Sequence, residues 1–443
     1  HSSKYINVKI KSSSDLDTLF GFSYWNYNPA KHNTFENCTV EARSIGGIIC
    51  ITTKEKMPEP IVPIAGVEGL NVTLNKDAVA ADNMTVGQAA VIELPDLTEI
   101  TSIVLENEEF TAYSFESGVL TINADAFAAN QIGVKNFAVT GKNTQGLIVI
   151  FEITMTVELV ATPVALDGTR EIVLSEASEY AVDLGEYAAS TVIGATFAGE
   201  SAVFANGMLT ISDDYKANKQ KHGTQTLKVT VEKDGKYYVV TVNILVVTKA
   251  ISTIDELTAA TTAGTDNVVY GYYKLTQNVG SSGAWISVAN NGSWQNADGS
   301  VGFHGTLDGS GFAVDGAFGT HGLFGIIGNG AVVKNITFNV YYYQNGRQTL
   351  ARSITGATIE GVTINIKSVS GTLDATKEGG VITGLMSHTT HYKNVTINAE
   401  GKDLDTLFGM SYGNYKAEKA NTFENCVVNA KSLAGLVHSN GII

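Results

Sequence analysis

The sequence is poor in cysteine, proline and charged residues, and each shortage narrows the choice of fold. Three cysteines among 443 residues are too few for a disulfide framework. Only 16% of the residues are charged against 44% that are hydrophobic, whereas a helical protein normally exposes many Glu, Lys and Arg. Six prolines accompany 45 glycines, so the turns depend on glycine. This composition favours β-structure with uncharged polar faces.

Positive charge and long apolar runs are also scarce. The formal net charge of −15 argues against binding to nucleic acid or to an anionic membrane surface. No run reaches the length of a membrane span, so no membrane insertion is expected. The sequence has no signal peptide and starts at His1 rather than at Met, which we interpret as a fragment or a processed form.

What the sequence does contain is a long repeat. Residues 15–38 and 403–426 agree without gaps at 18 of 24 positions, 388 residues apart. Cys38 and Cys426 occupy the same place in the two copies and are expected to be small, buried hydrophobic residues of a strand.

The middle of the chain has a different pattern. Three of the six prolines lie in the sequence MPEPIVP, which predicts a stiff linker over 58–63. Residues 64–161 and 162–249 each contain short alternating strands between turn signals, and Gly118–Ile122 matches Gly207–Ile211. This pattern predicts two tandem immunoglobulin-like β-sandwiches, similar to the modules that bacterial surface proteins string together.

From residue 250 onwards a short phrase recurs about every 30 residues. An apolar pair with glycine is followed by x-Asn-apolar-x-apolar, in which Asn335, Asn394 and Asn425 are the asparagines and Gly361 replaces one of them. Such a repeat predicts a solenoid, with apolar residues stacked in a continuous core and asparagine side chains stacked as an amide ladder at one corner.

The sequences FHGTLDGSGF at 303–312, GLFG at 322–325 and VKNI at 333–336 resemble the GLUG-type repeats of bacterial surface proteins. The resemblance extends over roughly 300–440 and 1–50. It implies a right-handed parallel β-helix and says little about function.

The expected fold is therefore all-β, with a parallel β-helix and two sandwiches. A capping-box spacing predicts a short helix at 253–261, which would cover the N-terminal end of a β-helix over 250–443. Residues 1–57 would be the last rungs of a preceding β-helix, equivalent to 388–443. We thus expect the chain to be part of a longer protein that repeats this whole unit.

Parallel β-helices include polysaccharide lyases and hydrolases, so acidic residues need attention. Asp308, Asp315 and His304 are the candidates, but Asp308 precedes glycine as a turn residue does, and no other rung is expected to add a carboxylate or a basic partner. No histidine spacing indicates a transition-metal site, and acidic turns such as 296–299 offer at most weak Ca²⁺ binding. We expect no catalytic residue, no metal site and no cofactor.

Aromatic residues beside Asn and Gln are the best candidates for a binding surface, because they stack on sugars or anchor protein interfaces. Alternatively, these aromatic side chains only cover the flank of the solenoid. Trp25 is replaced by Gly413 in the second copy, which argues against one fixed ligand. The predicted binding residues are Tyr24, Trp25, Tyr27, Tyr341, Tyr343, Tyr412 and Tyr415.

Together these patterns predict a non-enzymatic, modular, extracellular protein on the cell surface of a gut-type or similar bacterium. It would act as an adhesin, binding a host protein (mucin, immunoglobulin or similar) or a glycan, with the sandwiches as spacers and the repetition giving avidity. Two alternatives stay open. A cluster of Asp with Lys or Arg would favour a polysaccharide-cleaving enzyme, and burial of the aromatic segments would favour a structural stalk.

Overall fold

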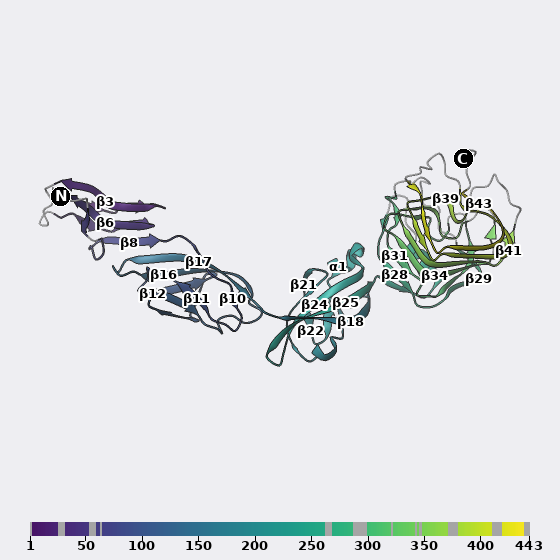
Figure 1. The fold of residues 1–443 in the computed structure, drawn as a ribbon, viewed down its shortest axis with the longest axis horizontal. Coiled ribbons are helices and arrows are strands. Elements are labelled where there is room, and N and C mark those ends of the chain that lie inside the picture. The colour runs from purple at the N-terminus through teal and green to yellow at the C-terminus, as the bar shows by residue number, and fades with distance from the viewer. Residues whose placement is uncertain are drawn as a thin grey trace. The chain divides into compact units, whose positions relative to one another are not determined.

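The computed structural model describes residues 2–24, 32–52, 59–62, 64–261, 268–286, 299–319, 322–341, 343–344, 348–370, 380–409 and 419–437. Nearly all of its regular structure is strand, which confirms the all-β class (Figure 1). The chain divides into two compact units, residues 1–162 with 234–237 and residues 163–233 with 238–443.

The first unit begins with two stacked rungs. Strands β1, β2 and β3 of one rung pair in parallel with β4, β5 and β6 of the next. Alternate residues of β5 are buried, so one face of each rung packs inwards. The strands of this part are β1 (Lys4–Ile6), β2 (Lys9–Lys11), β3 (Asp15–Tyr24), β4 (Thr34–Glu36), β5 (Cys38–Ala42), β6 (Ser44–Thr52) and β7 (Glu59–Val62).

The same unit continues with an immunoglobulin-like sandwich. One sheet runs in the order β13-β12-β16-β17-β8 and the other in the order β11-β15-β14. Strand β17 alternates between buried and exposed residues, as a strand with one face in a core must. The strands are β8 (Leu70–Asn75), β9 (Val79–Ala80), β10 (Met84–Thr85), β11 (Ala90–Glu93), β12 (Glu99–Leu105), β13 (Glu108–Glu109), β14 (Tyr113–Glu116), β15 (Val119–Ile122), β16 (Gly133–Lys142) and β17 (Ile148–Glu158).

The rungs and this sandwich share one sheet. Strand β8 pairs in parallel with β17 on one side and with β5 on the other, where Val40 lies opposite Val72. Part of the predicted linker, Glu59–Val62, is strand β7 and pairs antiparallel with β6. Apolar residues of the rungs and of the sandwich form one hydrophobic core.

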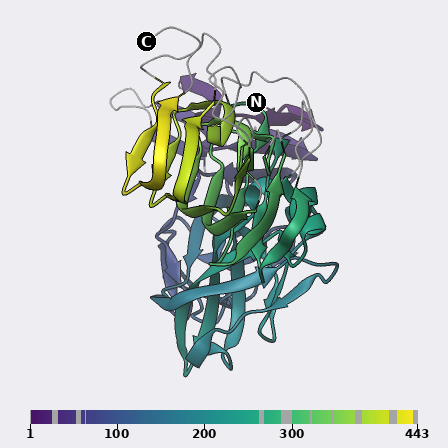
Figure 2. The ribbon, with the colours of Figure 1, turned by 90° about the vertical axis from the view of Figure 1, so that its right-hand side faces the viewer.

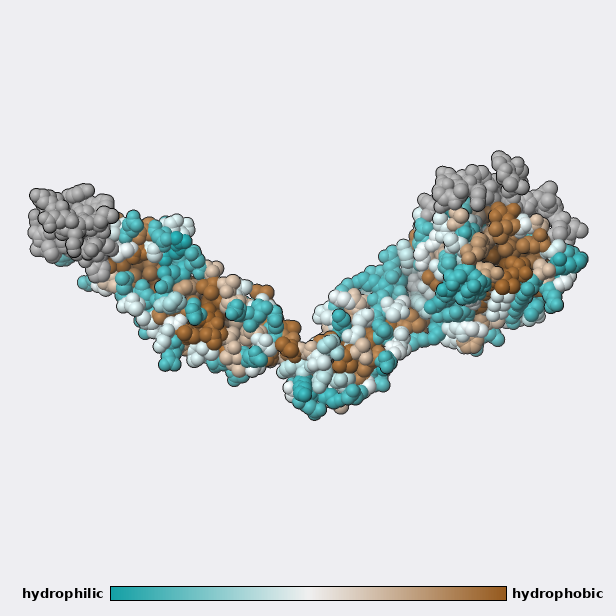
Figure 3. Space-filling view, viewed as in Figure 1, coloured by the Kyte–Doolittle hydropathy of each residue, from teal (hydrophilic) through white to brown (hydrophobic). Residues whose placement is uncertain are grey.

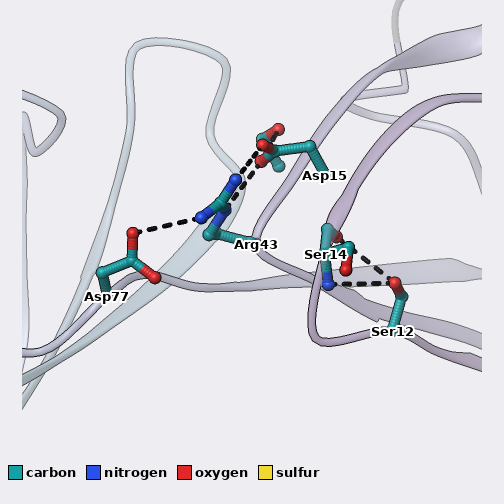
Figure 4. Close-up of polar contacts among 6 residues, drawn as sticks. Ser12, Ser14, Asp15, Arg43 and Asp77 are labelled. Atoms are coloured by element: carbon teal, nitrogen blue, oxygen red, sulfur yellow. Dashed lines mark hydrogen bonds and ion pairs between the residues drawn. The ribbon is translucent and has the colours of Figure 1, made fainter.

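An ion-pair cluster lies at the junction of rung and sandwich (Figure 4). Arg43 donates from Nε to Asp15 Oδ1 at 3.1 Å in the rung, and its Nη1 lies 3.3 Å from Asp77 Oδ2, just after β8. Ser44 Oγ also donates to Asp15 Oδ1 at 2.5 Å. The hydrogen bonds from Arg43 and then from Ser44 lower the pKa of Asp15 to about 2.

The second unit starts with a second sandwich. Its main sheet has the order β18-β25-β24-β20-β21 and its smaller sheet the order β19-β23-β22. Ser212 caps the short helix α1 by accepting from the amide of Tyr215. The elements are β18 (Thr162–Val173), β19 (Glu179–Ala181), η2 (Gly185–Tyr187), β20 (Thr191–Phe197), β21 (Glu200–Ala202), β22 (Phe204–Ala205), β23 (Met208–Thr210), α1 (Asp213–Ala217), η3 (Lys219–Lys221), β24 (Gly223–Lys233) and β25 (Lys236–Val247).

The β-helix follows directly. In the main ladder the strands β26-β28-β31-β34-β37-β41-β43 stack in parallel, and in the second ladder β27-β30-β33-β36-β39 do so (Figure 2). Its strands are β26 (Lys249–Ile251), β27 (Val268–Val269), β28 (Tyr272–Leu275), β29 (Val279–Ile286), β30 (Gly302–Phe303), β31 (Thr306–Asp308), β32 (Ala313–Phe318), β33 (Ile326–Ile327), β34 (Val332–Val340), β35 (Tyr343–Gln344), β36 (Ala351–Thr355), β37 (Thr358–Ile366), β38 (Val369–Ser370), β39 (Gly380–His388), β40 (His391–Lys393), β41 (Thr396–Phe408), β42 (Thr422–Glu424) and β43 (Val427–Val437).

A short helix, α2 (Ile254–Thr261), packs on the first rungs through Leu257 and Ala260, which join the hydrophobic core of the β-helix. The predicted capping box is present in a shifted form. The amide of Glu256 donates to Thr253 Oγ1 at 3.2 Å, but Glu256 Oε2 accepts from the amide of Ser252 at 2.9 Å rather than from that of Thr253.

The asparagines of the recurring phrase lie at a left-handed corner of each rung. Asn335, Asn394 and Asn425 have φ of 51°, 52° and 52°. Gly361, which replaces the asparagine in one rung, has φ of 61°. Glycine and asparagine are the residues that adopt this conformation most readily, so backbone geometry explains the exchange.

The main amide ladder lies four residues beyond the predicted one. Asn365 Nδ2 donates to Asn339 Oδ1 at 2.9 Å, and Asn398 and Asn429 continue the chain at 3.0 and 2.9 Å. Asp315 ends it by accepting from Asn339 at 2.6 Å. Among the phrase asparagines of the C-terminal rungs, Asn425 and Asn394 make a longer contact of 3.4 Å.

Candidate functional site

Of the seven predicted binding residues, only Tyr341 has a side chain among the described residues. Tyr341 is partly buried and follows β34, where its amide donates to the carbonyl of Gly316 at 3.0 Å. Tyr24 is the last residue of β3 and Tyr343 is the first residue of β35, and only the backbone of these two residues is described. The other four predicted residues lie outside the described residues; they are Trp25, Tyr27, Tyr412 and Tyr415.

The described residues just before two of the aromatic segments have different strand partners. Val340, just before Tyr341, pairs with Ile366 in the main ladder. Phe408, which precedes the segment with Tyr412 and Tyr415, pairs with Thr383 of the second ladder and also with Val437 of β43. The β-strand register therefore separates their points of origin.

A cavity with polar and apolar walls lies in the C-terminal rungs of the β-helix. It measures about 130 Å³, and both Gly409 and Ala420 line it. We call it the C-terminal cavity; its other lining residues are Leu385, Met386, Ser387, His388, Phe408, Asn421, Phe423, Leu436 and Val437. In Figure 3, hydrophobic surface gathers over β39 and β43 of this part of the β-helix.

A cluster of three aromatic rings supports the apolar wall. The ring of Tyr392 stacks on that of Phe423 with centroids 5.4 Å apart, and Phe408 lies 5.3 Å from Tyr392 and 6.0 Å from Phe423. Tyr392 is fully buried, whereas Phe408 and Phe423 also line the cavity. Aromatic contacts of this kind fix the position of each ring.

The polar wall is held by a set of mutual hydrogen bonds. Asn421 Nδ2 donates to the carbonyl of Ser387 at 3.0 Å, and Asn421 Oδ1 accepts from the amide of Thr390 at 3.0 Å. Ser387 Oγ lies 2.7 Å from the hydroxyl of Tyr392. Because these groups fix one another, the polar wall is organised before any ligand arrives.

His388 is the distinctive residue of this wall. Its side chain is 1% exposed, yet neither ring nitrogen has a hydrogen-bond partner in the described part of the chain. Burial, and then the charge of Lys419, lower the pKa of His388, so its imidazole is neutral at neutral pH. A neutral imidazole offers one donor and one acceptor, and buried polar groups of this kind normally have partners.

Sequence reasoning placed His388 on a turn of the rung and did not select it as a binding residue. The repeat aligned it with His1, which indicated a structural position. The cavity that His388 lines is completed by residues of another rung, such as Asn421 and Leu436, and no local sequence signal reports that proximity.

Asp308 does have a basic partner, contrary to the sequence expectation. Lys334 Nζ from the next rung lies 3.4 Å from Asp308 Oδ2, because Asp308 and Lys334 are paired in register. The hydroxyl of Tyr272 donates to the same oxygen at 2.7 Å, and the amide of Ser310 donates to Oδ1 at 2.8 Å. The Ser310 contact is the turn role that the sequence indicated.

These contacts fit a structural carboxylate. Burial alone would raise the pKa of Asp308, but the hydrogen bonds from Tyr272 and Ser310 and the charge of Lys334 outweigh it and lower the pKa. Asp308 therefore stays ionised at neutral pH and is a poor general acid. Asp315 is bound to Asn339 in the amide ladder.

Within the described ranges, no group of three or more His, Cys, Asp or Glu side chains is arranged to hold a metal ion. In the same residues, no helix is long and apolar enough to cross a membrane.

No protein-family model and no curated protein matches the chain. The solved structures that match it include a Bacteroides ovatus mixed-linkage glucan utilization locus protein, SGBP-B, in complex with a mixed-linkage heptasaccharide; it is 13% identical, covers 40% of this chain and 47% of its own, and gives a TM-score of 0.15. Sidekick-1 immunoglobulin domains 1–4 are 15% identical over 40% and 53% of the two chains, with a TM-score of 0.16.

The I-band fragment I67–I69 of titin is 10% identical over 40% of this chain and 68% of its own, again with a TM-score of 0.16. This chain thus spans about half the length of the first two structures. TM-scores this low carry no argument about function. The resemblance to GLUG-type repeats and the right-handedness of the β-helix stay predictions.

Proposed function

We propose that this chain is a non-enzymatic, adhesin-type binding protein of a bacterial cell surface, and that its β-helix takes a sugar residue of a glycan into the C-terminal cavity. The observation that carries the proposal is the buried imidazole of His388, which lacks a partner in the described chain and lines this cavity. A sugar hydroxyl both donates and accepts, so it matches the donor and acceptor of a neutral imidazole.

The apolar wall supports the same ligand class. Sugars bind proteins with one face against an aromatic or aliphatic surface and with their hydroxyls against fixed polar groups, and small-molecule sites generally combine these two kinds of wall. Phe423 and Leu436 provide the apolar side, while His388 and Asn421 provide the polar side. Tyr412 and Tyr415, in the segment that starts at this cavity, would extend the binding surface.

The sandwiches fit a role as spacers in this proposal. Their long strands pair with neighbours within the sheets, and their apolar side chains fill the two cores. Extracellular location agrees with the acidic, charge-poor composition, and repetition of such a unit would convert weak sugar contacts into avidity.

The experiment is a glycan-array screen of the purified chain, followed by calorimetry with the best ligand. We expect His388→Leu, which keeps the volume and removes both nitrogens, to weaken binding about tenfold or more, since about 1.4 kcal/mol is lost with each factor of ten. His391→Leu is the matched control, because His391 lies three residues away and outside the cavity lining.

Three outcomes would contradict the proposal. Equal loss in both histidine variants would mean that the cavity is not the site. Retention on host proteins such as mucin polypeptide, without any glycan bound, would assign a protein partner instead. Release of soluble oligosaccharides during incubation would mean that the chain is an enzyme.

A further inference from the structure

The last rung of the repeated segment occurs twice in the chain. In the first copy other strands pair with its outer edge, and in the second copy that edge is exposed. In the first copy, β4 and β5 with β6 form the last rung; in the second copy, β42 and β43 do so. Equivalent residues of the two copies make the same contact. The rings of Tyr5 and Phe35 are stacked with centroids 5.6 Å apart, and those of Tyr392 and Phe423 with centroids 5.4 Å apart. The two edges are therefore built alike.

Cysteine contacts confirm this equivalence. Cys38 Sγ donates to the carbonyl of Tyr5 at 3.4 Å, and Cys426 Sγ donates to the carbonyl of Tyr392 at 3.4 Å. The predicted burial holds for Cys38, but Cys426 is exposed. The same position thus has two environments.

Burial of the apolar residues differs in the same way. Val40 is 1% exposed, and its equivalent Val428 is 36% exposed. Ile48 is 8% exposed, and its equivalent Leu436 is 51% exposed. We call the open edge, from Phe423 to Val437, the C-terminal edge.

In the first copy, two further strands cover this edge: β7 pairs antiparallel with β6, and β8 covers β5. Strand β8 lies beside β5 in parallel with Leu70 opposite Cys38, Val72 opposite Val40 and, one pair further, Leu74 opposite Ala42. The amide of Cys38 donates to the carbonyl of Gly69 at 2.9 Å. On the C-terminal edge, the only described partner of β43 is β41, on its inner side.

The C-terminal edge also lacks the usual protection of a free sheet edge. Exposed edges are normally blocked by proline, several charges or a bulge, because they otherwise pair with another strand. Between Val427 and Val437 there is no proline, and Lys431 is the only charged residue. Val427 replaces Thr39 of the first copy, which makes this edge more apolar than its covered equivalent.

We propose that the C-terminal edge binds the first strand of a further immunoglobulin-like sandwich, by parallel strand addition in the register of β5 and β8. Residues equivalent to Leu70 and Val72 would lie opposite Cys426 and Val428. The partner is a sandwich other than the two described here. The β8 strand of this chain is already paired on both sides, with β5 and β17.

Local geometry adds a sequence requirement for the partner strand. Gly69 precedes β8 with φ of 75°, and a Cβ there would lie 2.1 Å from the carbonyl oxygen of Phe35. The equivalent carbonyl on the open edge is that of Phe423. The partner should therefore carry glycine followed by the alternating pattern Leu-x-Val-x-Leu. The first strand of the second sandwich, β18, lacks this pattern and has Arg170 and Glu171 in its place.

The test uses the full chain and a fluorescent peptide with the sequence of residues 59–76, EPIVPIAGVEGLNVTLNK, which includes the segments that cover the first copy. We expect saturable binding by fluorescence anisotropy and slower hydrogen exchange in residues 422–437, including the amide of Cys426. The same peptide with Gly69→Val should bind at least about tenfold more weakly, and a peptide of residues 162–173 should not bind.

Val428→Asp in the chain should weaken binding of the first peptide to a similar extent. Val91→Asp is its matched control, because Val91 is an exposed valine (61%) on a strand of the first sandwich. The glycine variant of the peptide leaves the chain intact, so a folding defect in Val428→Asp does not remove the test. Equal binding of the unaltered peptide and of its Gly69→Val variant would overturn the proposal.

Two further results would also overturn it. If no peptide binds and the chain sediments as a concentration-dependent assembly, the C-terminal edge is covered by a second copy. If no peptide binds and the chain stays monomeric, the edge is no docking surface. Phe423, Leu436 and Val437 belong both to the C-terminal edge and to the lining of the C-terminal cavity, so the peptide and a glycan would compete for this surface. Each is therefore measured in the absence of the other, and this inference and the proposed function fail separately.

Discussion

At the scale of single residues, Asn394 and His388 differ in what their positions require. One position requires a particular backbone conformation, and the other leaves a side chain able to bind a ligand. Asn394 lies at a left-handed corner with φ of 52°, where its backbone conformation is what matters. His388 lies six residues earlier, in a strand, and its side chain is buried without a described partner. The first residue stabilises a rung, whereas the second leaves hydrogen-bonding capacity unused.

The left-handed corner predicts an order of stabilities for variants of Asn394. Asn394→Ala should lower the free energy of unfolding by about 1–2 kcal/mol, because alanine pays a steric cost at positive φ. Asn394→Gly should cost less, since Gly361 occupies the same corner of a neighbouring rung. Urea unfolding followed by tryptophan fluorescence measures both. A glycine variant less stable than the alanine variant would contradict this explanation.

Burial of His388 predicts a pH dependence. Because its pKa is lowered in the fold, the unfolded chain binds more protons below the ordinary value of 6.5, and stability falls as the pH drops through that value. We expect a lower urea midpoint at about pH 5.5 than at about pH 7.5, and a smaller difference in His388→Leu. His222 and His304 also have lowered pKa values, so part of the difference remains in the variant. The same loss in both proteins would contradict the prediction.

At the scale of elements, the amide ladder ties one rung to the next. Each inner amide of the ladder donates to one neighbour and accepts from the other, whereas Asp315 at one end only accepts and Asn429 at the other only donates. Asn365 is in the middle and takes part in two of these bonds. Removing it leaves a donor and an acceptor unpaired in a partly buried ladder.

Asn365→Leu should therefore destabilise the β-helix by about 1–3 kcal/mol. Asn429→Leu is the control, because this asparagine ends the described ladder and takes part in one bond. Its expected cost is smaller. Thermal unfolding by calorimetry compares the two variants, and equal costs would mean that the ladder adds little beyond packing.

The sequence was sufficient to predict those strands and helices that are specified by residues close together in the chain. The phrase with Asn335 and Asn425 predicted stacked rungs, and the spacing before Glu256 predicted α2. It missed features that depend on which strands become neighbours, such as the salt bridge from Lys334 to Asp308 and the cavity around His388. Those contacts join residues from different rungs, and their register is set by strand pairing rather than by neighbouring residues.

At the scale of the whole molecule, each compact unit combines a sandwich with rungs of a solenoid. In the first unit, β5 and β8 place both in one sheet, so neither has a core of its own. A change at their shared strand pair should therefore affect both parts of that unit.

Val40→Asp tests this coupling, because Val40 lies opposite Val72 in the shared core. We expect faster hydrogen exchange both in the rung strand β5 and in the sandwich strand β17, whereas β24 of the second sandwich keeps its wild-type protection. Exchange that rises in the rungs alone would mean that the two parts are stable independently.

The joint between rung and sandwich also has a mechanical consequence. A pull directed along β5 and β8 would load their paired residues together, from Cys38–Leu70 to Ala42–Leu74, so the joint would resist in shear. Under tension along that direction, the chain would then extend by unfolding a whole rung-and-sandwich block rather than by bending at the proline-rich segment. Within this unit, force would then pass from rung to sandwich with little slack at the joint.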